Sequence, residues 1–122
     1  MSIENRAEAI IDLSAIEKNV KHLMAHSSAP ALAVVKANAY GHGLVAVARR
    51  AVKAGANWLG VALLEEALTL RAARVTAPIL AWLTPISDDF VAAIKNNIDL
   101  GIPSIAHLKQ VIIAAQSLQL TA

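Results

Sequence analysis

One unit repeats along the chain: a short apolar run followed by a segment with the periodicity of an amphipathic helix. The apolar runs begin at Ala31, Trp58, Ile79 and Leu100. Their spacing, roughly 20 residues or a little more, is close to the length of one strand and its helix. Repeated strand–helix units predict an α/β fold in which parallel strands are covered by helices.

Capping residues and breakers mark the boundaries of these units. Ser14, with Glu17 three residues later, has the pattern of a capping box, so we expect a helix from there to about His26. Ala31 to Val35 is a continuously apolar run of the kind that is buried on both faces of a parallel sheet. The other expected strands are Trp58 to Ala62, Ile79 to Leu83 and Leu100 to Pro103. The other expected helices are Leu44 to Ala54, Leu64 to Arg74, one capped by Ser87 or Asp88 and ending near Asn96, and one capped by Ser104 and ending near Leu118.

Two architectures are built from such units, an open doubly wound sheet and a closed (β/α)8 barrel. The first usually carries a glycine-rich phosphate loop, and neither a G-x-G-x-x-G pattern nor a Walker loop occurs in this sequence. A barrel places catalytic groups at the carboxyl ends of its strands, which is where Lys36 falls. Four strands make half of a barrel, with open edges and uncovered apolar faces. We therefore expect this sequence to be the N-terminal third or so of a longer chain.

Composition and charge narrow the functional classes. Hydrophobic residues make up 57% of the chain, which excludes an intrinsically disordered segment. The net charge is only +2, and the local basic cluster of Arg49, Arg50 and Lys53 fits the exposed face of a helix rather than a nucleic-acid-binding patch. The N-terminus lacks the apolar region of a signal peptide, and the uncharged runs are too short to cross a bilayer. We expect a soluble, cytoplasmic protein with no membrane or nucleic-acid partner.

Metal binding and disulfide formation are not expected. The chain has no cysteine. His22, His26 and His107 lie in predicted helices without a second ligand at a useful spacing. We therefore assign no metal site.

The apolar run that begins at Ala31 stops at a single lysine, Lys36, which is followed by a loop of small residues with one tyrosine and one histidine. Desolvation at the end of a buried strand disfavours the ammonium form of a lysine and lowers its pKa, which yields an amine that can act as nucleophile and base. That chemistry suits a Schiff base with an aldehyde cofactor. A lysine in such a place also commonly extends its ammonium group into water, and the spacing by itself leaves both interpretations open.

The octapeptide from Lys36 to Gly43 reads KANAYGHG and resembles, without a gap, the cofactor-lysine signature of the alanine racemases. Those enzymes bind pyridoxal 5'-phosphate on a TIM-type barrel, so the resemblance implies an α/β fold that is the N-terminal half of a (β/α)8 barrel. Residues 1–122 would form an incomplete cofactor-binding barrel domain, with the remainder of the barrel and a C-terminal β domain outside this sequence. The resemblance also implies a leading strand near Ala9 to Asp12 that associates with the second domain.

The resemblance assigns roles to three residues. Lys36 would hold pyridoxal phosphate covalently and, released by the incoming amino acid, would serve as one of two bases at the α-carbon. The Tyr40 hydroxyl would hydrogen-bond the cofactor phosphate, and Trp82 would line the site. The competing interpretations are a loop anchored by the Tyr40 ring and plain core packing of Trp82. We expect Asn38 to satisfy loop backbone groups, and His42 to be a supporting hydrogen-bonding residue rather than a catalytic one.

Two groups that the family uses are missing from this sequence. The second base is a tyrosine from the C-terminal domain of the partner subunit, whereas the only tyrosine here is Tyr40. The arginine beside the pyridine nitrogen has no counterpart, because Arg71 and Arg74 lie on a predicted helix and do not match its motif. The segment alone is therefore expected to be inactive.

Three functions are compatible with these observations. The first is alanine racemase, an isomerase that interconverts L-alanine and D-alanine for peptidoglycan precursors and works as a homodimer. The second is a related pyridoxal phosphate barrel enzyme that acts on another amino acid. The third is a non-catalytic pyridoxal phosphate-binding protein, which would be expected to lack the YGHG sequence that ends the octapeptide. The resemblance favours the racemase.

Overall fold

Four strands form one parallel sheet in the computed structural model, which describes residues 7–122. The strands are β1 (Leu32–Val34), β2 (Trp58–Val61), β3 (Ile79–Ala81) and β4 (Asp99–Leu100). They lie in chain order, β1-β2-β3-β4, whereas a doubly wound sheet reverses its order at a switch point. Chain order is the order of consecutive strands in a barrel, so this part of the sequence prediction is confirmed.

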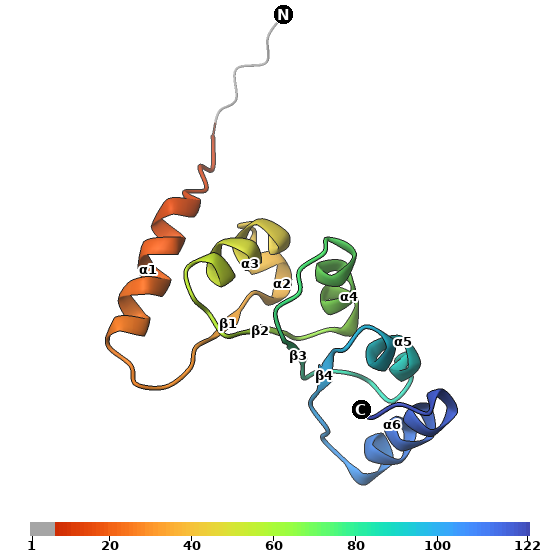
Figure 1. The fold of residues 1–122 in the computed structure, drawn as a ribbon. Coiled ribbons are helices and arrows are strands. Elements are labelled where there is room, and N and C mark those ends of the chain that lie inside the picture. The colour runs from red at the N-terminus through yellow and green to blue at the C-terminus, as the bar shows by residue number, and fades with distance from the viewer. Residues whose placement is uncertain (1–6) are drawn as a thin grey trace, which may run out of the picture.

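The helices are α1 (Leu13–Ala25), α2 (Lys36–Tyr40), α3 (Leu44–Lys53), α4 (Leu64–Ala72), α5 (Phe90–Lys95) and α6 (Ile105–Leu118). Figure 1 shows α3, α4 and α5 along one side of a curved row of strands. α1 packs beside α3, and α6 packs against α5. Every predicted helix is present, and α2 is an additional short turn directly after β1.

The main core lies between the sheet and the helices. Leu59, Val61, Ile79 and Ala81 alternate along β2 and β3 and are fully buried on the helix side. Each buried leucine or isoleucine contributes on the order of 1.5–3 kcal/mol relative to an exposed one. The helix residues that complete this core include Val47, Ala48, Leu64, Ala67, Leu70 and Ala93.

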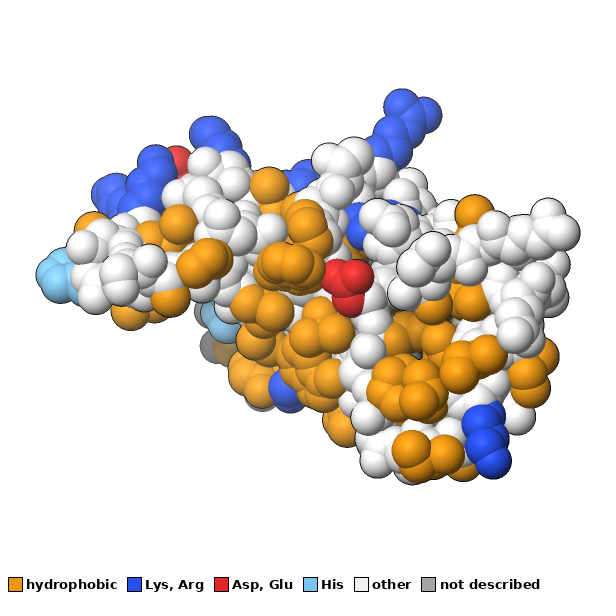
Figure 2. Space-filling view, turned by 60° about the horizontal axis from the view of Figure 1, so that its bottom comes forward, with side chains coloured by type: hydrophobic (Ala, Val, Ile, Leu, Met, Phe, Trp, Pro, Cys, Tyr) orange, Lys and Arg blue, Asp and Glu red, His pale blue; other side chains and the backbone are white. Residues whose placement is uncertain are grey.

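The opposite face of the sheet is apolar and open. Leu32, Val34 and Trp58 lie on it and are 42%, 55% and 42% exposed. Figure 2 shows hydrophobic side chains gathered on this side of the molecule. The prediction that the run from Ala31 to Val35 is buried on both faces is therefore wrong, because within residues 7–122 no element covers this face. In a closed barrel it would be the interior face.

The region before β1 differs from the prediction in two ways. The leading strand expected near Ala9 to Asp12 is not formed, since a strand needs a hydrogen-bonding partner and this segment has none among the described residues. α1 is capped by Asp12, whose Oδ1 accepts from the backbone N–H of Ser14 at 2.8 Å and of Ala15 at 3.1 Å. The capping box of Ser14 with Glu17 is therefore wrong, because the carboxylate of Asp12 already satisfies these first amides.

The starts of α5 and α6 and the end of α4 agree only in part with the prediction. α5 is capped by Asp89, which accepts from Ala92 N–H at 2.9 Å, and not by Ser87 or Asp88. α6 is capped by Ser104, as predicted. α4 ends at Ala72, so the helical position predicted for Arg74 is wrong; Arg74 follows the helix with a φ of 61°.

Arg71 ties α4 to the segment that leads into β4. Its guanidinium donates at 2.7–2.8 Å to four backbone carbonyls, those of Val75, Ala77, Asn96 and Asn97. Burial lowers the pKa of this guanidinium from its ordinary value, and the charge of Asp99 opposes that shift. With its donors committed to the backbone, Arg71 is a structural residue.

One carboxylate fastens α1 to α3. Glu17 Oε2 accepts from Arg50 at 2.9 Å and lies 3.8 Å from Lys53 Nζ, while Oε1 accepts from Lys21 at 2.7 Å. The hydrogen bond from Lys21, followed by that from Arg50, lowers the pKa of Glu17 from 4.5 to about 2. Two members of the basic cluster, Arg50 and Lys53, thus contribute to the attachment of α1.

We expect Glu17→Gln to remove a pH-dependent part of the free energy of unfolding. A carboxyl group whose pKa is about 2 when folded and 4.5 when unfolded stabilises the fold above about pH 4.5 and loses this contribution as the pH falls towards 2. Urea unfolding should show a variant that is less stable at neutral pH and less sensitive to acid. Glu8→Gln, which removes an exposed carboxylate before α1, is the control. Identical acid profiles for wild type and Glu17→Gln would contradict this role.

Candidate functional site

Lys36 lies where the sequence predicts, directly after the carboxyl end of β1. The preceding residue, Val35, is buried, and its backbone N–H donates to Gly60 O of β2 at 2.9 Å. The pairing of β1 with β2 therefore continues up to the lysine. The Lys36 side chain itself is half-buried. Barrel proteins carry their reacting groups at this end of the strands.

The backbone after Lys36 makes one left-handed turn, α2. The four residues from Ala37 to Tyr40 have φ between 50° and 55°. In this conformation a residue with a Cβ costs about 1–2 kcal/mol. Gly41 and Gly43 follow with φ of 87° and 96°, which glycine adopts freely. The two glycines indicated a tight backbone, but not that four non-glycine residues precede them in the same conformation.

Two side chains of the octapeptide support this turn. Asn38 Oδ1 accepts from the backbone N–H of Leu44, the first residue of α3, at 2.8 Å, so the loop role predicted for Asn38 is confirmed. His42 Nδ1 lies 2.8 Å from Ala39 O, and because a carbonyl only accepts, this ring nitrogen donates. His42 is exposed and makes a local hydrogen bond, which fits the supporting role predicted for it.

A third support comes from α4, and the sequence analysis missed it. Glu66 accepts from the backbone N–H of Ala37 at 2.5 Å and from those of Ala62 and Leu63 at 3.0 Å each. The sequence feature that could have indicated this role is the position of Glu66 in the first turn of a predicted helix, where a carboxylate can accept from backbone amides. The usual serine or threonine of a capping box was absent, because the residue before α4 is Leu63.

Lys36 and Tyr40 line a cleft at the β1 edge of the sheet. Lys36 Nζ lies 4.7 Å from the centroid of the Tyr40 ring, within the range of a cation–π contact. The Tyr40 side chain is 73% exposed. The cleft has a volume of about 410 Å³, and its other lining residues are Ile16, Val34, Ala39, His42 and Val47. An amine, a phenol and an imidazole thus border one largely apolar hollow.

Trp82 lies on the open face of the sheet but does not line this cleft. It follows β3, and its ring packs over Gly60 of β2: a Cβ added to Gly60 would lie 2.7 Å from Trp82 Cζ3 and 2.6 Å from Leu32 Cδ2. The structure therefore gives Trp82 a packing role, and its contact with a cofactor stays a prediction.

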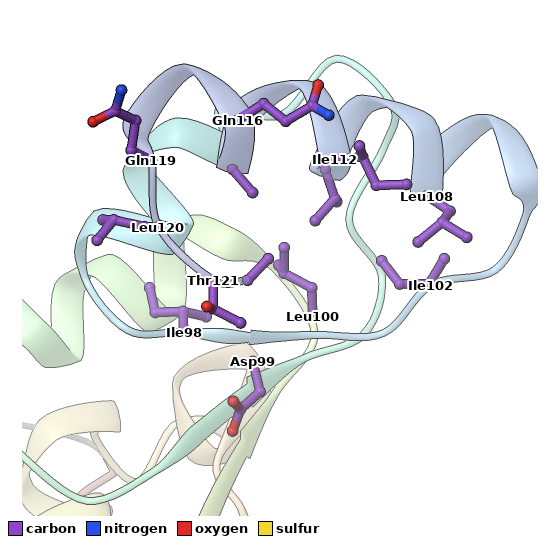
Figure 3. Close-up of a pocket in the computed structure, with 13 residues that line it drawn as sticks. Ile98, Asp99, Leu100, Ile102, Leu108, Ile112, Gln116, Gln119, Leu120 and Thr121 are labelled. Carbon is purple, nitrogen blue, oxygen red and sulfur yellow. The ribbon is translucent and has the colours of Figure 1, made fainter.

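A larger cavity, of about 610 Å³, is separate from this site (Figure 3). It lies between α6, β4 and the residues after α6, and most of its lining residues are apolar. Asp99 is the only titratable side chain among its lining residues, and Figure 3 shows the carboxylate pointing away from it. That carboxylate accepts from Trp58 Nε1 at 2.9 Å. The cavity is therefore mainly apolar, and no titratable side chain points into it.

Residues 7–122 hold neither a cluster of metal-ligating side chains nor a helix that could span a membrane. No group of three or more His, Cys, Asp or Glu side chains there is close enough together to hold a metal ion. None of the helices in that range combines the length and the apolar character needed to cross a membrane. The cleft at Lys36 therefore remains the candidate site.

The fold and the site define a class of protein. Parallel strands in chain order, covered by helices on one face, are the architecture of a βα barrel. The lysine at the carboxyl end of β1 lies at the rim where barrel enzymes carry their reacting groups.

Comparison with known proteins identifies the family. Residues 11–122 match the family described as alanine racemase, N-terminal domain. Over 111 residues the chain is 50% identical to the alanine racemase of Thermobifida fusca, covering 90% of this chain and 30% of that protein. It is 45% identical over 111 residues to the alanine racemase of Salinispora tropica, covering 91% of this chain and 30% of that protein. The chain belongs to the alanine racemase family.

Solved structures show the same relationship. The alanine racemase of Streptomyces lavendulae superposes with a TM-score of 0.89 at 46% identity, covering 92% of this chain and 30% of that chain. The alanine racemase of Bacillus anthracis with bound L-Ala-P superposes with a TM-score of 0.67 at 32% identity, covering 88% of this chain and 37% of that chain. The predicted fold class, the N-terminal half of a TIM-type barrel, is confirmed. The chain spans about 30% of the length of the relatives it matches.

We expect Gly101→Ala to destabilise the fold more than Gly60→Ala. A Cβ at Gly101 would lie 2.9 Å from the Cα of Trp82, which moves only if the backbone after β3 moves. A Cβ at Gly60 would meet the ends of two side chains that can rotate away on the open face. Overpacking against fixed atoms typically costs about 1–3 kcal/mol. Urea unfolding followed by tryptophan fluorescence compares the two variants, and a larger loss for Gly60→Ala would contradict this packing.

Proposed function

We propose that this chain is the cofactor-lysine part of a pyridoxal 5'-phosphate-dependent alanine racemase, an isomerase that interconverts L-alanine and D-alanine. The observation that carries the proposal is the position of Lys36, whose amine lies at the carboxyl end of β1, over the ring of Tyr40. The membership of the chain in the alanine racemase family supports the same reaction.

The residues around Lys36 fit pyridoxal phosphate. The half-buried Lys36 borders a cleft of about 410 Å³, which lies within the range of small-molecule sites. Its primary amine would hold the aldehyde carbon of the cofactor. The Tyr40 hydroxyl has no hydrogen-bond partner within residues 7–122 and would donate to the phosphate. Trp82, on the same open face, is proposed as a wall of the completed site.

The cofactor and Lys36 would each supply a different part of the reaction. When bound, the cofactor would supply the electron sink that makes the α-proton of alanine removable. The Lys36 amine would accept or return that proton on one face of the α-carbon. In this proposal Tyr40 binds the phosphate, and its ring lies against Lys36, so it is not assigned as a base. A second base therefore has to come from elsewhere.

We assign that second base to a tyrosine of a partner subunit in a homodimer. The complete protein would then add the remainder of the barrel and a C-terminal β domain to the half-barrel of this chain. In this proposal the enzyme is cytoplasmic and supplies D-alanine for peptidoglycan precursors.

Mixing the protein with pyridoxal phosphate and reducing it with borohydride should fix the cofactor to Lys36. Peptide mapping identifies the modified residue. Lys36→Arg keeps a cation above the Tyr40 ring but removes the primary amine, so it should abolish the adduct. Lys53→Arg, on exposed α3 surface, should leave the adduct unchanged. A wild-type adduct on Lys53 or Lys95 in place of Lys36 would refute the proposal.

The 122-residue chain by itself should not racemise alanine. It brings an amine to one face of the α-carbon and no base to the other, because its only tyrosine lies beside that amine. Formation of D-alanine from L-alanine, measured with added pyridoxal phosphate, should equal that of Lys36→Arg and of the cofactor alone. A rate clearly above both controls would show that the second base is within this sequence.

A further inference from the structure

The carboxylate of Glu66 bridges two segments that follow neighbouring strands. Its Oε1 accepts from the N–H of Ala37, 29 positions earlier in the chain and directly after Lys36. Its Oε2 accepts from the N–H groups of Ala62 and Leu63, which follow β2. Glu66 is half-buried and forms no ion pair among residues 7–122, so both of its oxygens serve the backbone.

Lys36 is thereby held from both sides. The N–H before it, on Val35, donates to Gly60 O at 2.9 Å, and the N–H after it, on Ala37, donates to Glu66 at 2.5 Å. Both acceptors belong to the unit formed by β2 and α4. The direction in which the lysine side chain leaves the backbone is therefore set by that unit, and its Nζ lies over the Tyr40 ring.

The anchor acts at the start of the strained turn. Ala37 is the first of the four consecutive non-glycine residues of this turn that have positive φ, and Glu66 is the only partner of its N–H among the described residues. Such conformations persist only where surrounding contacts determine them. If Ala37 relaxed to an ordinary negative φ, the chain would leave Lys36 in a different direction.

We propose that Glu66 is the positioning residue of Lys36: its carboxylate fixes the backbone of Ala37 and so presents the lysine amine to pyridoxal phosphate. This inference rests on the proposed function, in which that amine holds the cofactor. The negative charge is needed because three N–H donors face the two oxygens. A glutamine offers one accepting oxygen and would turn an NH2 group towards the remaining donor or donors.

Three variants distinguish the effects of side-chain length, of the number of accepting oxygens and of negative charge at the helix N-terminus. Glu66→Gln keeps the length of the side chain but loses one acceptor. Glu66→Asp keeps the charge near the helix N-terminus, which favours folding, but is one methylene too short to bridge Ala37 and Leu63 together. Glu65→Gln removes the same charge from the same helical turn at an exposed neighbour and is the matched control.

Amide hydrogen exchange measured by NMR tests the anchor without any cofactor. The Ala37 amide should exchange about tenfold faster or more in Glu66→Gln and Glu66→Asp than in wild type and Glu65→Gln, because a charge-assisted hydrogen bond is lost. The core amides of Leu59 and Val61 should change much less. Unchanged exchange at Ala37, or an equal acceleration at Leu59 in both Glu66 variants, would overturn the proposal.

The rate at which pyridoxal phosphate forms its borohydride-reducible adduct on Lys36 tests the consequence. It should fall about tenfold or more in both Glu66 variants and stay at the wild-type value in Glu65→Gln. A wild-type protein without an adduct on Lys36 would refute the proposed function, and the exchange data would still report on the anchor. A normal adduct rate in the Glu66 variants, with a wild-type adduct on Lys36, would overturn the positioning role alone.

Discussion

One-sided burial of the parallel sheet determines the rest of the structure. Leu59, Val61 and Ile79 are fully buried towards the helices, and the alternation of strand side chains sends their neighbours to the other face. Because the strands are parallel and in chain order, the segments that follow them meet at one edge. The contact between Ala37, after β1, and Glu66, after β2, is a direct result. The packing of one face thus brings the segments that follow β1 and β2 together at the rim.

The same packing leaves the second face open. Trp82 lies across Gly60, and Trp58 donates to Asp99 from two strands away, so the side chains on this face already contact one another. A Cβ at position 60 would meet the side-chain ends of both Leu32 and Trp82, so these two side chains pack closely over the glycine. An exposed apolar area of this kind is typical of a surface that contacts further protein.

Hydrophobic periodicity was sufficient to predict the order of the strands and helices and the position of Lys36, because each βα unit carries its own pattern. Local pattern could not choose between competing caps: Asp12 and Ser14 are both good capping residues, and only the geometry of the first amides favours Asp12. The burial of β1 was overestimated, since a continuous apolar run does not reveal whether its second face is covered by this chain. Glu66 was missed because its bond to Ala37 joins residues that are distant in sequence.

The composition of the octapeptide follows from the turn that it forms. A β-branched or bulky side chain is a strong outlier at positive φ, whereas asparagine is enriched there, as at Asn38, and Ala37 and Ala39 carry no side chain beyond the Cβ. Asn38 adds a hydrogen bond to the start of α3, so it serves the turn twice. Tyr40 is the exception, a bulky residue at φ 53°, and its ring lies under the amine of Lys36. The motif therefore encodes a backbone shape as much as a set of reactive groups. A shape with this much local strain needs an acceptor from outside the motif, and the carboxylate that α4 supplies is that acceptor.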